Sequence, residues 1–171
     1  MGMVYWITGL SGAGKTTIGF LLYKKLKENY PNTVFLDGDT LRRVFGDDLG
    51  YTKEDRRKCA MRYARLCQML EQQDMNVVCC TISMFDSVRS WNRENICHYK
   101  EVYVRVSMEV LHQRNQKKLY SESLAGTERQ VVGLQIDLEE PKCPDLILDN
   151  DGERTPQEQL EKMIAFFNKM L

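Results

Sequence analysis

The sequence lacks an excess of either charge, since its 171 residues carry 24 Lys and Arg against 24 Asp and Glu. This balance produces no global field that would attract nucleic acid or an acidic membrane surface. The sequence also lacks an apolar run of the length needed to cross a bilayer. Only three residues precede the apolar stretch that begins at Val4, and they leave no room for a secretion signal. We therefore expect a cytoplasmic protein that has neither nucleic acid nor a membrane as a partner.

Patterns typical of metal sites and disulfides are missing as well. The six cysteines show no C-x-x-C spacing, and the two histidines, His98 and His112, do not cluster with them. Most of the cysteines lie in apolar runs, which predicts buried free thiols in a reducing compartment. With 43% hydrophobic and 28% charged residues, the composition is that of a soluble globular protein. We expect residues 1–171 to form a single domain with one core.

One stretch carries a recognisable binding motif. Residues 9–16, Gly-Leu-Ser-Gly-Ala-Gly-Lys-Thr, match G-x-x-x-x-G-K-[ST] and lie between an apolar β-prone run and a segment with helical spacing. The glycines let backbone N–H groups turn inward, and a helix N-terminus adds partial positive charge, so the loop can hold phosphate oxygens. We expect Lys15 at the β- and γ-phosphates of a nucleoside triphosphate and the Thr16 hydroxyl at Mg²⁺. A chance glycine-rich turn is the alternative. The residues predicted to bind the triphosphate are Gly9, Ser11, Gly12, Ala13, Gly14, Lys15, Thr16 and Thr17.

Strand-like and helix-like segments alternate along the chain. This alternation predicts an α/β fold in which helices cover both faces of a doubly wound, parallel five-stranded sheet, giving three layers. The predicted strands are 4–8, 33–36, 76–82, 101–106 and 145–148.

Some of these segments carry further information. The 76–82 run is too apolar to alternate and predicts a central strand, whereas 101–106 alternates more and predicts a place nearer an edge. Thr52 and Asp55 have the spacing of a capping box at the start of a long helix. The long, charged connection 116–144 is typical of an active-site lid.

Acidic and basic residues are expected together at one edge of this sheet. Asp37 and Asp39 follow the second strand, and the carboxyl ends of parallel strands border the ligand crevice. Arg42, Arg56 and Arg114 recur at the same edge, and phosphoryl transfer needs such positive charge. The pattern favours a small-molecule kinase over a switch, motor or transporter. A strand-end capping role for Asp37 and solvated surface positions for the arginines are the alternatives.

The sequence resembles the adenylyl-sulfate kinase family over nearly its whole length. Beyond the phosphate-binding loop, the resemblance rests on Leu-Asp-Gly-Asp-Thr-Leu-Arg and Asp-Leu-Gly-Tyr-Thr-Lys-Glu-Asp-Arg, both specific to that family, and on several shorter matches. These blocks are 36–42, 48–56, 82–83, 117–120, 132–133 and 140–141. The resemblance implies a P-loop kinase fold and ATP-dependent phosphorylation, with Mg²⁺, of the ribose 3′-hydroxyl of a nucleotide with an activated 5′-phosphate. Relatives are often dimers, so it also allows a homodimer.

The resemblance also implies roles for individual residues. Lys15, Asp37 and Asp39 would form the catalytic set, with the two acids acting at Mg²⁺ and the attacking hydroxyl; their separate roles stay open, although Asp39 is favoured for orienting the hydroxyl. Arg114 would lie on the ATP side, and Thr16 and Asp37 would be the metal ligands. The residues implied on the acceptor side are Asp39, Arg42, Arg56, Cys59, Ile82, Ser83, Met84, Phe85, Lys117 and Val131.

Departures from the family pattern gather on the acceptor side. Cys59 stands where the family has Asn, Met84 and Phe85 stand where it has Pro and Tyr, and Val131 stands where it has a stacking Phe. Losing an aromatic platform removes on the order of 1–3 kcal/mol of base stacking. A site that has changed its base-reading groups should prefer another base. The chain is similar here to the branch of the family that phosphorylates cytidine diphosphoramidate in capsular polysaccharide biosynthesis.

Other functions remain open from the sequence. Drift in a degenerate paralogue would also explain the departures, and a true adenylyl-sulfate kinase making 3′-phosphoadenylyl sulfate would tolerate them. A different small-metabolite or nucleoside-monophosphate kinase, or a non-catalytic nucleotide-binding switch, would share the same scaffold.

Overall fold

The computed structural model describes residues 1–46, 48–114 and 139–168. They form a parallel five-stranded sheet in the order β2-β3-β1-β4-β5. The strands are β1 (Val4–Thr8), β2 (Thr33–Asp37), β3 (Asn76–Thr81), β4 (Tyr99–Arg105) and β5 (Leu146–Asp149). The helices are α1 (Lys15–Lys27), α2 (Gly38–Val44), α3 (Lys53–Glu71), α4 (Asp86–Asn95), α5 (Met108–Arg114) and α7 (Pro156–Asn168). The predicted α/β fold with a parallel five-stranded sheet is confirmed.

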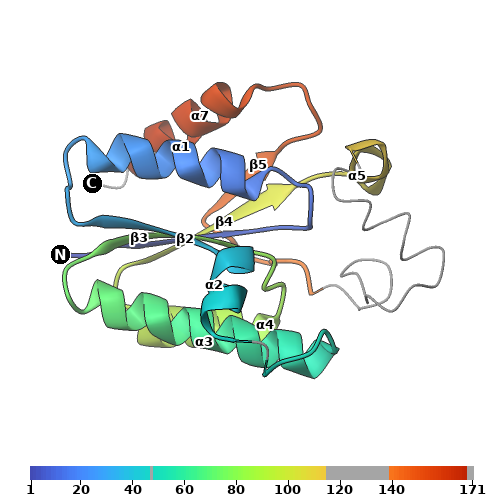
Figure 1. Ribbon diagram of the computed structural model, residues 1–171. Helices are drawn as coiled ribbons and strands as arrows, with labels where there is room; N and C mark the ends of the chain where they lie inside the picture. The colour runs from blue at the N-terminus through green and yellow to red at the C-terminus, as the bar shows by residue number, and fades with distance from the viewer. Residues whose placement is uncertain (47, 115–138, 169–171) are drawn as a thin grey trace.

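Helices cover both faces of the sheet, α1 and α7 on one side and α3 and α4 on the other (Figure 1). Successive side chains of a strand point to opposite faces, so β1 serves two cores. Ile7 packs with Ile18 and Leu22 on the α1 side, whereas Trp6 packs with residues of α3 and α4 on the other. The three predicted layers are therefore present.

The position predicted for the fourth strand is wrong. β3 and β4 both pair with β1, and each lies one strand from an edge of the sheet. The alternation that suggested an edge comes from Glu101, Tyr103 and Arg105, and of these Glu101 and Tyr103 are buried. The Glu101 carboxylate pairs with Arg93 at 2.9 Å and Arg89 at 3.5 Å. A charged residue can occupy an interior strand when side chains from a neighbouring helix pair with its charge.

Helix α2 was not predicted, because its first residues read as a loop after the second strand. Asp37 caps it, since one carboxylate oxygen accepts hydrogen bonds from the backbone N–H groups of Asp39 (3.1 Å) and Thr40 (3.2 Å). An aspartate at this position satisfies backbone donors that the helix itself leaves unpaired. Asp37 thus has the capping role considered as the alternative to a site role.

The predicted start of the long helix is confirmed. Thr52 precedes α3, and its hydroxyl oxygen accepts from the backbone N–H of Asp55 at 3.1 Å. Most of the predicted lid lies outside the described residues; residues 139–144 form neither helix nor strand and lead into β5.

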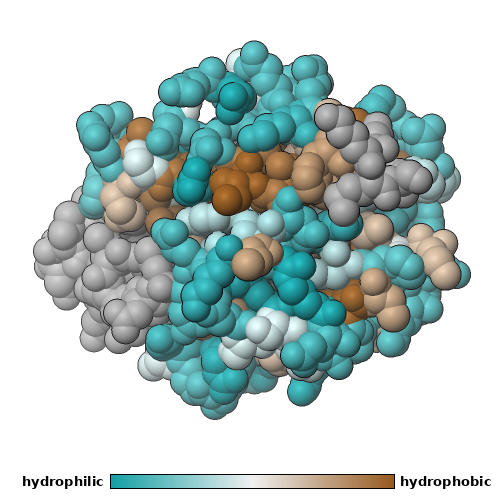
Figure 2. Space-filling view, turned by 180° about the vertical axis from the view of Figure 1, so that it is seen from behind, coloured by the Kyte–Doolittle hydropathy of each residue, from teal (hydrophilic) through white to brown (hydrophobic). Residues whose placement is uncertain are grey.

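The cysteines and the surface agree with a globular chain. All six cysteines are free thiols, and Cys59, Cys67, Cys79 and Cys80 are buried as expected for most of them. No helix in the described ranges combines the length and the apolar character that a bilayer crossing requires. Seen from behind, hydrophilic residues cover most of the surface and surround a hydrophobic band across its upper half (Figure 2).

Candidate active site

The loop between β1 and α1 has the backbone geometry of a phosphate-binding loop. Gly12 and Gly14 have φ angles of 80° and 94°, which L side chains adopt only under strain. A Cβ atom on Gly14 would lie 2.7 Å from Nδ2 of Asn150. Gly14 precedes α1 without a side-chain cap, and the first turn of α1 contains no acidic residue. The positive end of this helix is therefore available to an anion.

Lys15 and Thr16 join this loop to its surroundings. The Lys15 side chain is 8% exposed, and its Nζ donates to the carbonyl oxygen of Leu10 at 2.6 Å. This contact holds the ammonium group across the mouth of the loop. The Thr16 hydroxyl donates to Oδ2 of Asp37 at 2.9 Å, which links α1 to the end of β2. Of the other predicted triphosphate-binding residues, Gly9 and Ala13 are buried, Ser11 is half-buried and Thr17 is exposed.

The two aspartates lie at the same edge as this loop. Asp37 uses one carboxylate oxygen for Thr16 and the other for the cap of α2. Asp39 is exposed in the first turn of α2, and its charge acts on Arg56 of α3. The structure thus brings the end of β2, the start of α1 and the start of α3 to one place, as the sequence predicted.

Two arginines converge on the ring of Tyr51. The guanidinium carbon of Arg42 lies 4.2 Å from the ring centroid and that of Arg56 lies 5.2 Å from it. Arg42 donates to the carbonyls of Leu49 (2.6 Å) and Gly50, and Nε of Arg56 donates to the Tyr51 carbonyl at 3.0 Å. Burial, together with the nearby Arg42 charge, lowers the pKa of Arg56. Two guanidinium groups around one ring concentrate positive charge at this place, and such charge suits an anion.

Cys59 contacts the α2 region through a tyrosine. It is only 4% exposed, and its Sγ donates to the Tyr63 hydroxyl at 2.9 Å. That hydroxyl donates in turn to the carbonyl oxygen of Gly38 at 3.0 Å, between the two aspartates. Burial raises the pKa of Tyr63 well above its ordinary value, so the phenol stays protonated. This link could not be foreseen, because helical spacing indicates only that Tyr63 lies on the buried face of α3.

The residues after β3 turn inward. Ser83 is buried, and its Oγ lies 2.7 Å from Oγ1 of Thr81. Met84 and Phe85 are buried in the two hydrophobic cores, one on each side of the sheet. Ile82 is half-buried, and its carbonyl accepts from the Thr8 hydroxyl at 2.7 Å. Of the four predicted acceptor side chains in this segment, only that of Ile82 is partly exposed.

Two predicted acceptor residues, Lys117 and Val131, lie outside the described residues. Arg114 is described, and its Nη2 donates to the carbonyl oxygen of Asn150 at 2.6 Å. The side-chain amide of Asn150 donates to the carbonyl oxygen of Ala13 at 2.8 Å. Asn150, which the sequence did not single out, thus lies between Arg114 and the phosphate-binding loop.

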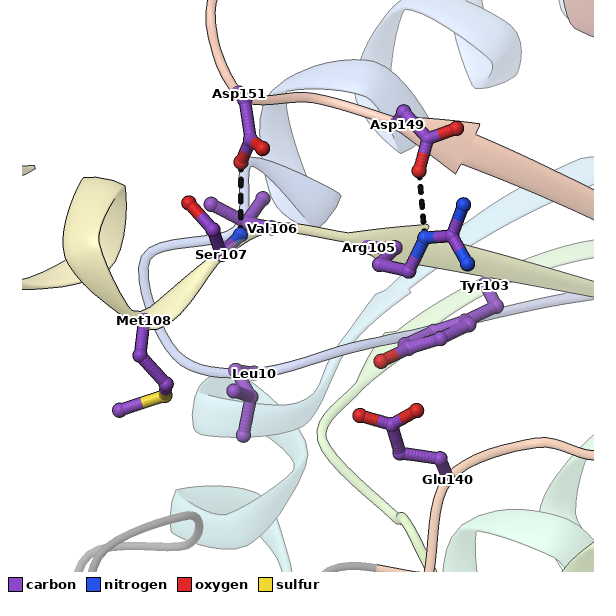
Figure 3. Close-up of a pocket in the computed structure, with 9 residues that line it drawn as sticks. All are labelled: Leu10, Tyr103, Arg105, Val106, Ser107, Met108, Glu140, Asp149 and Asp151. Carbon is purple, nitrogen blue, oxygen red and sulfur yellow. Dashed lines mark hydrogen bonds and ion pairs between the residues drawn. The ribbon is translucent and has the colours of Figure 1, made fainter.

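A pocket of about 430 Å³ opens beside the phosphate-binding loop (Figure 3). Asp149 pairs with Arg105 at 2.6 Å, Asp151 accepts from the Ser107 N–H at 2.8 Å, and burial raises the pKa of Tyr103 to about 12. With three acids and one arginine, the pocket suits neutral parts of a ligand better than phosphate. Its lining is Leu10, Tyr103, Arg105, Val106, Ser107, Met108, Glu140, Asp149 and Asp151.

The Thr16–Asp37 pair fits a magnesium ion. Within the described ranges, no three His, Cys, Asp or Glu side chains gather as an all-protein metal cage. Mg²⁺ does not need one, because it binds proteins through one or two oxygen ligands and takes the rest from water and substrate phosphates. A hydroxyl and a carboxylate oxygen 2.9 Å apart, at the start of α1, supply such ligands.

The sheet order, the phosphate-binding loop after β1 and the acids at the end of β2 define a P-loop kinase. The chain belongs to the adenylylsulphate kinase family, whose model matches residues 1–149. Its relatives are named kinases, and it is accordingly an ATP-dependent phosphotransferase.

Two curated relatives have different acceptors in their names. A cytidine diphosphoramidate kinase of Campylobacter jejuni is 39% identical over 161 residues, covering 94% of each chain. An adenylyl-sulfate kinase of Halothermothrix orenii is 38% identical over 168 residues, covering 98% of this chain and 90% of the relative. Among solved structures, the APS kinase of Mycobacterium tuberculosis in complex with AMPPNP and APS superposes with a TM-score of 0.89 at 28% identity, covering 98% of each chain.

Proposed function

We propose that this protein transfers the γ-phosphoryl group of ATP to the ribose 3′-hydroxyl of cytidine diphosphoramidate. The observation that carries the choice of acceptor is the state of Cys59. Where the family resemblance puts an asparagine, this chain has a thiol that is buried and bonded to Tyr63, so no amide is offered to an acceptor. The 39% identity to a cytidine diphosphoramidate kinase over 94% of both chains supports the same choice.

The ATP side of the mechanism rests on the phosphate-binding loop. Backbone N–H groups of the loop and the Lys15 ammonium neutralise the β- and γ-phosphates. Thr16 and Asp37 would hold Mg²⁺, which supplies further charge neutralisation at the phosphates when bound. The hydrogen bond from Lys15 to the Leu10 carbonyl holds the ammonium group beside the loop, and an ammonium group placed in advance is the kind of charge that acts on a phosphoryl group.

The acceptor side rests on Asp39 and the two arginines. Asp39 orients the 3′-hydroxyl, whose oxygen attacks the γ-phosphorus in line with the bond to the β–γ bridging oxygen. That bond breaks, ADP leaves, and the hydroxyl proton passes to the Asp39 carboxylate. Arg42 and Arg56, held around Tyr51, bind the 5′-diphosphate group of the acceptor.

The acceptor is tested by steady-state kinetics with cytidine diphosphoramidate and adenylyl sulfate measured side by side. We expect kcat/KM to favour the cytidine compound by at least about a hundredfold, because a site that has changed the groups that read one base should reject that base. ³¹P NMR of the product should place the new phosphate on the 3′-oxygen. A preference of orders of magnitude for adenylyl sulfate would contradict this acceptor and leave the kinase activity standing.

A true adenylyl-sulfate kinase is the second candidate. The Halothermothrix orenii enzyme of that name is nearly as similar, at 38% identity over 98% of this chain. The same kinetic comparison separates the two candidates, because each predicts the opposite order of kcat/KM.

Tyr63→Phe tests whether the hydrogen bonds from Cys59 through Tyr63 to the Gly38 carbonyl help to position the aspartates on either side of Gly38. The variant removes the hydrogen bond to the Gly38 carbonyl, which is worth about 1 kcal/mol, and we expect kcat to fall about fivefold with the KM for ATP unchanged. Tyr23→Phe is the matched control, since that hydroxyl only accepts from Lys27 on the surface of α1. Equal kcat values for the two variants would show that the link has no role in turnover.

A further inference from the structure

We infer that Asn150 is a positioning residue for ATP, which sets the direction of the peptide group between Ala13 and Gly14. The residue follows β5 and lies beside the phosphate-binding loop, 137 residues from Ala13 along the chain. Its Nδ2 donates to the Ala13 carbonyl oxygen at 2.8 Å. Because a trans peptide carries its C=O and N–H on opposite sides, this bond points the Gly14 N–H away from Asn150 and toward the phosphate side of the loop.

Contacts with β4 and α7 hold the Asn150 side-chain amide in this orientation. The backbone N–H of Asn150 donates to the Arg105 carbonyl at 2.9 Å. Gln159 of α7 is fully buried, and its Nε2 donates to the Asp149 carbonyl at 2.6 Å and lies 3.4 Å from Oδ1 of Asn150. The amide oxygen therefore faces a donor and the amide nitrogen faces Ala13, so the side chain cannot turn over without losing both contacts.

The phosphate-binding loop packs directly against the Asn150 amide at Gly14. A Cβ on Gly14 would come within 2.7 Å of Nδ2, and Gly14 has a φ of 94°. Asn150 also accepts, through its carbonyl oxygen, the hydrogen bond from Nη2 of Arg114 at 2.6 Å. One residue thus holds both the loop and the arginine proposed to act at ATP.

Asn150→Asp tests this role, with the dissociation constant of AMPPNP measured by calorimetry. Aspartate keeps the shape and the oxygen that faces Gln159 but has no N–H for Ala13. We expect binding to weaken about tenfold, the loss associated with a misdirected hydrogen bond to a charged group, with the acceptor KM unchanged. Asn95→Asp is the matched control, because its Nδ2 donates to the Trp91 carbonyl at the same 2.8 Å, away from the loop.

A purely structural role predicts a different result. The melting temperature would fall in both variants, but AMPPNP would bind each folded variant within about twofold of the original protein, and this result would overturn the inference. If Asn150→Asp does not fold, Asn150→Ala provides the same measurement without the added charge.

The inference rests on the proposed placement of the triphosphate in the loop, and Lys15→Ala in the same assay separates the two. If Lys15→Ala binds AMPPNP as well as the original protein, the placement itself fails. If Lys15→Ala weakens binding and Asn150→Asp does not, only the role of Asn150 fails.

Discussion

Lys15→Ala is expected to lower kcat by about a thousandfold, the usual loss when a charged group that stabilises the transferring phosphoryl is removed. Lys15 lies in the first turn of α1, almost fully buried, with its ammonium group fixed by the Leu10 carbonyl. A cation held in a water-poor site acts on the developing phosphoryl charge far more strongly than one in solvent. The rate of ADP release at saturating ATP and acceptor measures the effect.

The matched control for this variant is Lys25→Ala. Lys25 lies on the same helix but is exposed, and it pairs with Glu28 at 2.6 Å. Exposed pairs of this kind contribute little, so turnover should not change. A Lys15→Ala variant that retained turnover within about tenfold of the original would place the phosphoryl group away from α1.

Asp39→Asn is expected to lower kcat by about a hundredfold or more, within the range for a lost general base, while ATP affinity stays within about twofold. Asparagine keeps the size of the side chain but can neither carry the charge nor take the hydroxyl proton. The neighbouring Asp37 still holds Thr16 and caps α2, so the ATP side should remain intact. Turnover is measured as above and ATP affinity by calorimetry.

Asp74→Asn provides the control for the loss of one carboxylate. Asp74 is exposed, next to the chain's N-terminal ammonium at 3.6 Å, and follows α3 at the opposite end of the sheet. The Asp74→Asn variant should therefore keep the kcat of the original protein. If Asp39→Asn also does, Asp39 takes no part in orienting the hydroxyl.

The ATP side of the site could be predicted because it is local in sequence. The glycines, Lys15 and Thr16 lie within one loop, and the strand and helix on either side follow from the periodicity of their apolar residues. β1 spans the predicted residues without change. Asp37 ends β2 and Asp39 follows it, and the shared edge of parallel strand ends is the reason that the sequence predicts them near the loop.

Long-range partners explain what could not be predicted. Asn150 meets Ala13 across 137 residues, and Tyr63 meets Gly38 across 25, so no window of sequence contains either pair. Glu101 suggested an edge strand because its two arginine partners lie on α4 and are not visible in the strand's own pattern. Polar residues buried by partners from elsewhere are where periodicity fails.

A crystal structure with AMPPNP and the acceptor nucleotide bound tests the central claim most directly. The account predicts the Lys15 ammonium within hydrogen-bond distance of the γ-phosphate, and the acceptor 3′-oxygen between that phosphate and the Asp39 carboxylate. A terminal phosphate bound away from Lys15, or a 3′-hydroxyl on the far side of the sheet from Asp39, would contradict it.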